Sequence, residues 1–169
     1  IRDMVREFAQ SRLKPDARRL DETGEFPLSA LREMAELGLM GINVSGDHGG
    51  TEAGVVAYSL AMIEIAAACA STAVTTGVTN MVAEIIQKYG NEEQRKTHIS
   101  AICSGDAVCG AFALSETGAG SDAGSLRCKA VRDGNHYVLN GEKMWITNAA
   151  KADWYFVLAY TDAAAGHRG

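Results

Sequence analysis

The chain has 169 residues, of which 47% are hydrophobic and 22% charged, and its formal net charge at pH 7 is -5. This composition is typical of a folded globular protein and too apolar for a disordered chain. The acidic balance argues against a nucleic-acid binder, because such a protein needs a basic surface. The apolar runs are too short to predict a membrane span, and no signal peptide is expected.

The first part of the chain shows helical periodicity. Apolar residues recur at spacings of three and four over residues 1–13 and 28–37, which predicts two amphipathic helices. Residues 55–71 are apolar on nearly every face, so we expect a central, buried helix there. Further helices are predicted over 79–89 and 91–104, the latter with a capping box formed by its first residue and Gln94.

After Gly105 the apolar period changes to two, which predicts strands. The expected strands are residues 107–114, 125–131, 136–139, 142–147 and 153–160. The pairs Asp133-Gly134 and Asn140-Gly141 predict hairpin turns of type I′ between consecutive strands. The sequence therefore predicts an α+β protein, with an all-α N-terminal helical domain over residues 1–106 and an incomplete antiparallel β domain over residues 107–169.

The cysteines and histidines predict no special chemistry. The four cysteines are Cys69, Cys103, Cys109 and Cys128. They form no CxxC pair and lie in apolar or strand-like runs, which predicts buried free thiols in a reducing compartment rather than disulfides. The four histidines are scattered, so no metal site is expected.

A glycine- and hydroxyl-rich loop, SETGAGSD, is expected at Ser115–Asp122. It lacks the lysine of a phosphate-binding P-loop, and a strand rather than a helix follows it, which also excludes a dinucleotide-binding fingerprint. Its glycines allow a ligand close to the backbone, and its N–H and hydroxyl groups suit a ligand with several acceptors. The alternative is a tight turn between strands that binds nothing.

The segment KMWITN is the second candidate. If it is a strand, Trp145 and Thr147 lie on the same face. An aromatic surface beside a hydroxyl group suits a flat heteroaromatic ring with polar edges. The alternative is a tryptophan that packs in the protein core.

Together these motifs resemble the acyl-CoA dehydrogenase family of flavoproteins. The resemblance rests on GAFALSETGAGSD, VLNGEKMWITN and ADWYFVLAYTD, preceded by ELGLMGINVSGDHGG and YGNEEQRKTHISAICSGD, and it extends over the whole chain. It implies an N-terminal helical domain, a middle β-barrel-like domain and a C-terminal helical bundle. This chain would supply the first domain and about half of the second, and the bundle would be absent from it.

The resemblance also implies an activity. Family members use FAD to form an α,β double bond in an acyl-CoA thioester and pass the electrons to an electron-transferring flavoprotein. It implies fatty-acid or branched-chain amino-acid catabolism, a homotetramer or homodimer, and the bacterial cytoplasm or the mitochondrial matrix. The catalytic glutamate is expected after residue 169, so no catalytic residue is assigned here. The alternatives are an acyl-CoA oxidase or flavin monooxygenase-like relative, or a non-catalytic flavin- or acyl-binding relative.

The site residues implied by the resemblance are FAD contacts in both motifs. In the first motif, Phe112 and Leu114 would border the flavin ring, Ser115 would bind its pyrimidine edge, and Gly120 and Ser121 would meet the pyrophosphate. In the second motif, Trp145 would pack on the flavin face and Thr147 would place its hydroxyl at N5. Ile146 would contribute backbone contacts only. Ser121 would also lie near the CoA part of the substrate. Glu116 and Asp122 are assigned to loop structure rather than to ligand binding.

Overall fold

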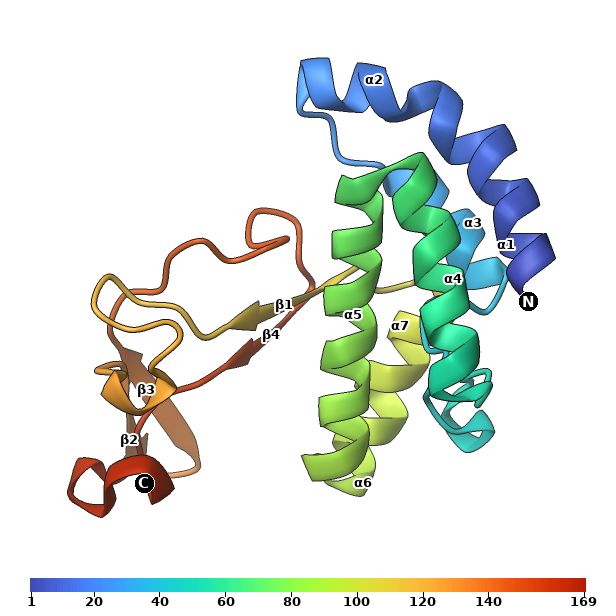
Figure 1. Cartoon of the computed structure of the whole chain (residues 1–169). Coiled ribbons are helices and arrows are strands. Elements are labelled where there is room, and N and C mark those ends of the chain that lie inside the picture. The colour runs from blue at the N-terminus through green and yellow to red at the C-terminus, as the bar shows by residue number, and fades with distance from the viewer.

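The computed structural model separates helices and strands into two regions of the molecule (Figure 1). It describes the backbone of residues 1–169 and all side chains except those of residues 167 and 168. The helices precede Gly105, and the strands begin at Gly110. No helix in the described part of the chain combines the length and the apolar character needed to cross a membrane.

The N-terminal helices confirm the periodicity of the sequence. Val5, Ala9 and Leu13 lie on the buried face of the first helical run, and α3 begins directly after Pro27. The helices are α1 (Arg2–Phe8), α2 (Lys14–Thr23), α3 (Leu28–Glu36), α4 (Gly54–Ala68), α5 (Ala70–Tyr89), α6 (Glu92–Gln94) and α7 (Ser100–Ser104), with π-helical turns at Ala9–Leu13 and Arg95–Ile99 and 3-10 turns at Gly46–His48, Ala123–Ser125 and Ala163–Arg168.

The prediction of a central, buried helix over residues 55–71 is wrong. α4 covers most of this segment, but Val55 and Val56 expose 68% and 71% of their surface. The segment also breaks at Cys69, whose extended backbone separates α4 from α5. A helix that is apolar on every face carries no information about which face is inside.

The central helix is instead α5, and its buried face is largely polar. It begins at Ala70, whereas the sequence predicted a start near Thr79. The prediction was late because the first turns are rich in threonine and valine, β-branched residues that are weak helix formers. The Thr76 hydroxyl donates to the backbone carbonyl one turn earlier, and the Asn80 side chain pairs with the backbone of Leu39 and Ile42. The buried polar groups are therefore satisfied within the core.

The predicted capping box is confirmed. The side chain of Asn91 accepts from the backbone N–H of Gln94 over 2.8 Å, and the Gln94 side chain accepts from the backbone N–H of Asn91 over 2.9 Å. The same helical run ends at Gly105, whose φ of 81° lies in the left-handed region that glycine adopts without strain. The change from helix to strand follows directly.

The strands form two separate pairs. They are β1 (Gly110–Ala113), β2 (Lys129–Asp133), β3 (His136–Asn140) and β4 (Trp154–Val157). β2 and β3 pair in antiparallel register, as predicted. β1 pairs with β4 in parallel register, with Phe112 opposite Phe156, so the prediction of a wholly antiparallel sheet is wrong. The described strands close no barrel.

The two predicted hairpin turns have different outcomes. The turn between β2 and β3 forms, but φ is positive at Gly134 and not at Asn135, which matches a type II′ rather than a type I′ turn. The turn predicted at Asn140-Gly141 joins no hairpin, because the residues that follow form no strand. The strand predicted over 142–147 is therefore wrong.

Gly110 connects β1 to the central helix. Its N–H donates to Oγ1 of Thr79 over 3.2 Å, and its carbonyl accepts from Nδ2 of Asn148 over 2.9 Å. A Cβ at this position would lie 2.8 Å from the Cβ of Val82, so the close approach requires glycine. Figure 1 shows β1 and β4 extending away from α5, and this junction therefore determines where the loop after β1 lies.

All four cysteines are buried and free, as predicted. Burial raises the pKa of the Cys103 thiol to about 11. Burial, together with the negative charge of Asp153, likewise raises the pKa of Cys109 to about 11. Both thiols are therefore protonated at neutral pH, and their role is in packing.

Candidate functional site

The loop Ser115–Asp122 is a tight turn with one open face. The backbones of Glu116 and Ala119 exchange two hydrogen bonds of 2.7 and 3.2 Å, which close the turn. A Cβ on Gly118 or Gly120 would meet no atom within 4 Å, so the glycines face open space. Among the described residues, no acceptor pairs with the backbone N–H groups of these two glycines. The loop can therefore offer N–H donors to an anionic ligand.

The predicted ligand residues of the loop lie where a ligand can reach them. Ser115 and Gly120 are half-buried, and Ser121 is exposed. Asp122 is held within the loop, because its carboxylate and carbonyl accept from the side chain and backbone N–H of Ser125. Asp122 therefore has the structural role that was predicted for it.

Phe112 and Leu114 alternate with the fully buried residues of β1, and Phe112 packs at the edge of the core. Ala111 and Ala113 are buried, whereas Phe112 and Leu114, the latter just beyond the strand, are half-buried. The ring of Phe112 stacks on that of Phe156 with a centroid distance of 5.6 Å. Both residues are only partly covered by protein, and their contact with a flavin stays a prediction.

Trp145 is the most unusual residue of the site. It lies in an irregular segment, with a φ of 60° and 87% of its surface exposed. A bulky residue with positive φ is strained, and such strain persists where the surrounding structure enforces it, often at functional sites. The expected strand face shared by Trp145 and Thr147 does not exist, since both are in a bend and turn. Ile146 and Thr147 are half-buried beside it.

Asn148 is a residue that sequence reasoning missed. Its φ is 67°, and its side chain accepts from Oγ1 of Thr75 over 3.0 Å while it donates to the Gly110 carbonyl. It therefore fixes the end of residues 143–148, which we call the Trp145 segment, to both α5 and β1. Asparagine tolerates the left-handed conformation better than most residues, and this preference was the available signal.

Glu116 and Lys143 form a largely buried ion pair beneath the two segments. Lys143 Nζ lies 2.8 Å from Oε1 of Glu116 and also donates to the Leu114 carbonyl over 2.8 Å. The Glu116 carboxylate accepts the backbone N–H groups of Arg127 over 2.6 Å and Cys128 over 3.0 Å. We call this arrangement the Glu116–Lys143 clasp. It confirms the structural role predicted for Glu116.

The environment of Glu116 favours its charged form. Burial alone raises the pKa of the carboxyl group, but the hydrogen bond from Lys143 and those from the two backbone N–H groups outweigh it. The pKa of Glu116 therefore lies below its ordinary value, and the side chain is ionised at neutral pH.

The structure brings the two predicted motifs together. The Met144 N–H donates to the Ser115 carbonyl over 3.0 Å, so the Trp145 segment runs alongside the start of the loop. An exposed indole, an open turn with free N–H donors and several hydroxyl groups thus lie in one region. This set fits a ligand with a flat heteroaromatic ring and a charged, acceptor-rich tail.

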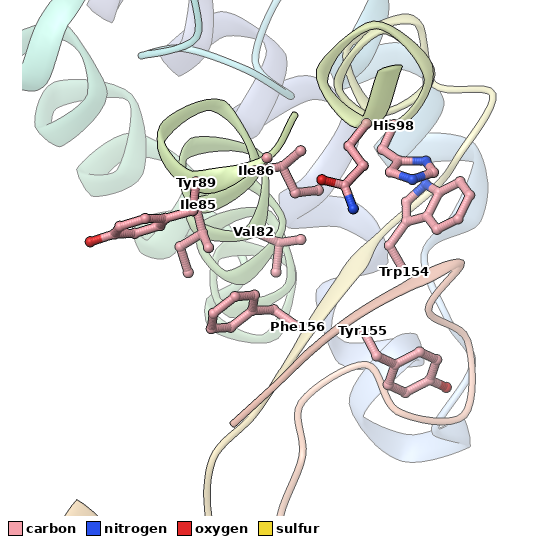
Figure 2. A pocket seen from close by; sticks show the side chains of 10 residues that line it. Val82, Ile85, Ile86, Tyr89, His98, Trp154, Tyr155 and Phe156 are labelled. Atoms are coloured by element: carbon pink, nitrogen blue, oxygen red, sulfur yellow. The ribbon is translucent and has the colours of Figure 1, made fainter. Parts of the chain in front are cut away.

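A separate cavity of about 310 Å³ lies between α5 and β4. Figure 2 shows Val82, Ile85 and Ile86 on the helix side, with Trp154 and Phe156 on the strand side. The rings of His98 and Trp154 pack with a centroid distance of 4.0 Å at its rim. None of the predicted cofactor residues is among the residues that line this cavity.

Comparison with known proteins identifies relatives over the whole chain. Residues 1–106 match the family model for the N-terminal domain of acyl-CoA dehydrogenase, and residues 111–169 match that for its middle domain. A probable acyl-CoA dehydrogenase of Bacillus subtilis is 43% identical over 162 residues, which cover 95% of this chain and 42% of that protein. The mitochondrial short-chain specific acyl-CoA dehydrogenase of Bos taurus is 42% identical over 170 residues, which cover 100% of this chain and 41% of that protein.

The fold likewise matches solved structures. Glutaryl-CoA dehydrogenase from Mycobacterium smegmatis in complex with FADH2 superposes with a TM-score of 0.90 at 35% identity, covering 95% of this chain and 42% of that chain. The chain thus spans about two fifths of the length of the proteins it matches.

Proposed function

Because this chain belongs to the acyl-CoA dehydrogenase family, we propose that it is the FAD-contacting part of an enzyme that forms a double bond between the α and β carbons of an acyl-CoA thioester. The relatives support FAD as the cofactor, since one of them is seen in complex with FADH2. The two domains matched by this chain are the helical and middle domains of that family.

The observation that carries the proposal is the conformation of Trp145. An 87% exposed indole on a backbone with φ of 60° gains nothing for the fold that a smaller residue would not supply. It suits a residue that packs on a ligand, because a flat ring would cover the apolar surface that water now contacts. Its place beside the loop Ser115–Asp122 favours a ligand that spans both segments.

The residues present suit the different parts of FAD. We propose that Trp145 packs on the flavin ring, with Phe112 and Leu114 at its border and the Thr147 hydroxyl at N5. Ile146 would contribute backbone contacts only. When bound, the cofactor supplies the two-electron acceptor that the reaction needs.

The loop would hold the more polar parts of the ligand. We propose that the Ser115 side chain meets the pyrimidine edge of the flavin, and that Gly120 and Ser121 meet the pyrophosphate. The free N–H donors and the open space beside the glycines support this assignment. Ser121 would also lie near the CoA moiety of the substrate.

The remaining properties of the enzyme are proposals that rest on the family. The base that removes the α-proton would be a glutamate outside these residues. The electrons would pass to an electron-transferring flavoprotein, and the subunits would assemble as a homotetramer or homodimer. Bacterial and mitochondrial relatives both exist, which supports the bacterial cytoplasm or the mitochondrial matrix as the compartment.

The proposal is tested by flavin binding to the purified protein and to Trp145→Ala. We expect the wild type to bind FAD, and the variant to bind it about 2- to 10-fold more weakly, because aromatic pairs contribute ~0.5–1.5 kcal/mol beyond burial. Tyr89→Ala is the matched control, since Tyr89 is also an exposed aromatic residue, 71% exposed at the end of α5. A wild type without FAD would overturn the proposal, and equal FAD binding by both variants would remove Trp145 from the site.

A further inference from the structure

The Glu116–Lys143 clasp differs from the other ion pairs of the described side chains. The two side chains are 8% and 12% exposed, whereas every other pair has a member more than a third exposed. Exposed pairs contribute little to stability, but a buried charge whose partner is removed is strongly unfavourable. Separating the two charges of the clasp, or removing one of them, would therefore destabilise the folded protein.

The contacts of the clasp join three separate stretches of chain, residues 114–116, residues 127–128 and Lys143. Lys143 reaches the carbonyl of Leu114 at the end of β1, and Glu116 reaches the N–H groups of Arg127 and Cys128 ahead of β2. The ion pair itself joins the loop to the Trp145 segment. All of these hydrogen bonds involve a charged partner, which makes them stronger and more directional than neutral ones.

The clasp lies directly beside the proposed flavin contacts. Glu116 follows Ser115, and Lys143 precedes Trp145 by two residues. The hydrogen bond from the Met144 N–H to the Ser115 carbonyl lies between them. The ion pair and this hydrogen bond therefore both hold the Trp145 segment next to Ser115.

We propose that Glu116 and Lys143 are positioning residues, which set the spacing between the loop and the Trp145 segment so that both can hold one flavin. The proposal rests on the proposed function, since it takes Ser115 and Trp145 as flavin contacts. The two side chains need not touch the cofactor, because their contacts with protein already account for their geometry. They act by holding Ser115 and Trp145, the residues that contact the cofactor.

The test compares Glu116→Gln and Lys143→Met with the wild type in the full-length polypeptide. Both substitutions nearly preserve side-chain length and remove one charge. We expect FAD affinity to fall roughly tenfold or more, because removing one member of a buried pair leaves the other uncompensated. We also expect the visible absorption bands of the remaining bound flavin to shift. Lys143→Arg keeps the charge and should restore most of the affinity lost in Lys143→Met.

The matched control is Glu64→Gln. Glu64 is also largely buried, with 10% of its side chain exposed, and it accepts two hydrogen bonds from Arg6 of 3.0 and 2.7 Å. It lies in α4, away from both motifs. We expect this variant to lower the unfolding temperature while FAD affinity and the flavin spectrum stay as in the wild type.

The outcomes separate the two proposals. If the wild type holds FAD and the clasp variants match the control, losing stability but neither affinity nor spectrum, the positioning role is overturned. If the wild type holds no FAD, the proposed function fails and the positioning role fails with it. Should the neutral variants not fold, Glu116→Asp decides, because it keeps the charge but shortens the reach. A shifted flavin spectrum would then support the role, and an unchanged one would overturn it.

Discussion

Replacing Gly110 by alanine should push β1 away from the central helix. The added Cβ would lie 2.8 Å from Cβ of Val82 and 3.0 Å from each of its two methyl groups. These distances are about 0.5 Å or more below the ~3.5 Å at which carbon atoms pack favourably. Val82 is buried and its Cβ is fixed to the α5 backbone, so rotating its side chain cannot relieve the closest contact.

The cost can be worked out from the contacts of Gly110. Overpacking a core position by one methyl group costs about 1–3 kcal/mol. If the strand moves out by about half an ångström, the 3.2 Å bond to Thr79 exceeds hydrogen-bonding distance, which costs about 1 kcal/mol more. We therefore expect Gly110→Ala to lower the free energy of unfolding by about 2–4 kcal/mol.

Equilibrium urea unfolding, followed by circular dichroism, measures this loss. Gly118→Ala is the control, because a Cβ there meets nothing within 4 Å and φ is not positive. It should change the free energy by less than about 0.5 kcal/mol. Val82→Ala removes two of the three close contacts, so the double variant should be more stable than the summed single effects by about 0.5–3 kcal/mol.

Either of two results would refute the close packing of Gly110 against Val82. One is a Gly110→Ala protein as stable as Gly118→Ala, which would mean that β1 and α5 do not approach as closely as described. The other is strict additivity in the double variant, which would mean that the two methyl groups of Val82 contribute nothing to the loss.

Three further predictions concern other parts of the chain. Asn148→Gly should be about 1 kcal/mol more stable than Asn148→Ala by urea unfolding, because both lose the side-chain hydrogen bonds but only alanine is strained at a φ of 67°. The hydrogen bond from Arg6 lowers the pKa of Glu64, so the ionised carboxylate stabilises the folded state at pH 7. The difference in unfolding free energy between the wild type and Glu64→Gln should therefore be largest at pH 7, and it should shrink as the pH falls below the ordinary carboxyl value of about 4.3. Residues 1–169 expressed alone should show no acyl-CoA-dependent reduction of a dye acceptor, because the proposed base lies elsewhere; reduction of the dye would place the base within this chain.

Much of the helical part could be predicted from the sequence because its signals are local. Spacings of three and four residues placed Val5, Ala9 and Leu13 inside, and the capping box located Asn91. The helix α4 was predicted, but its exposure was not, because its apolar residues surround the helix on every side. Which face is buried then depends on the neighbouring helices, and no local pattern records them.

The β region was harder because its pairing is not local. The hairpin of β2 and β3 has a two-residue turn at Gly134, and that turn was visible in the sequence. The parallel pairing of β1 with β4 joins strands that start at Gly110 and Trp154, and no residue pattern marks such a partner. The two motifs could be located as segments, but the ion pair that joins them connects Glu116 and Lys143, an acid and a base far apart in sequence.

The polar face of α5 explains how a strained, exposed tryptophan is tolerated. Thr75 holds Asn148 and Thr79 holds Gly110, so two hydroxyl groups of one helix fix the C-terminal end of the Trp145 segment and the start of β1. An apolar α5 would bury more carbon surface but would leave the Gly110 N–H and the Asn148 amide without these partners, at about 1–3 kcal/mol for each unsatisfied group. The polar buried face of α5 and the exposed Trp145 are thus connected, because the buried threonines hold the irregular segment in place while its indole stays exposed.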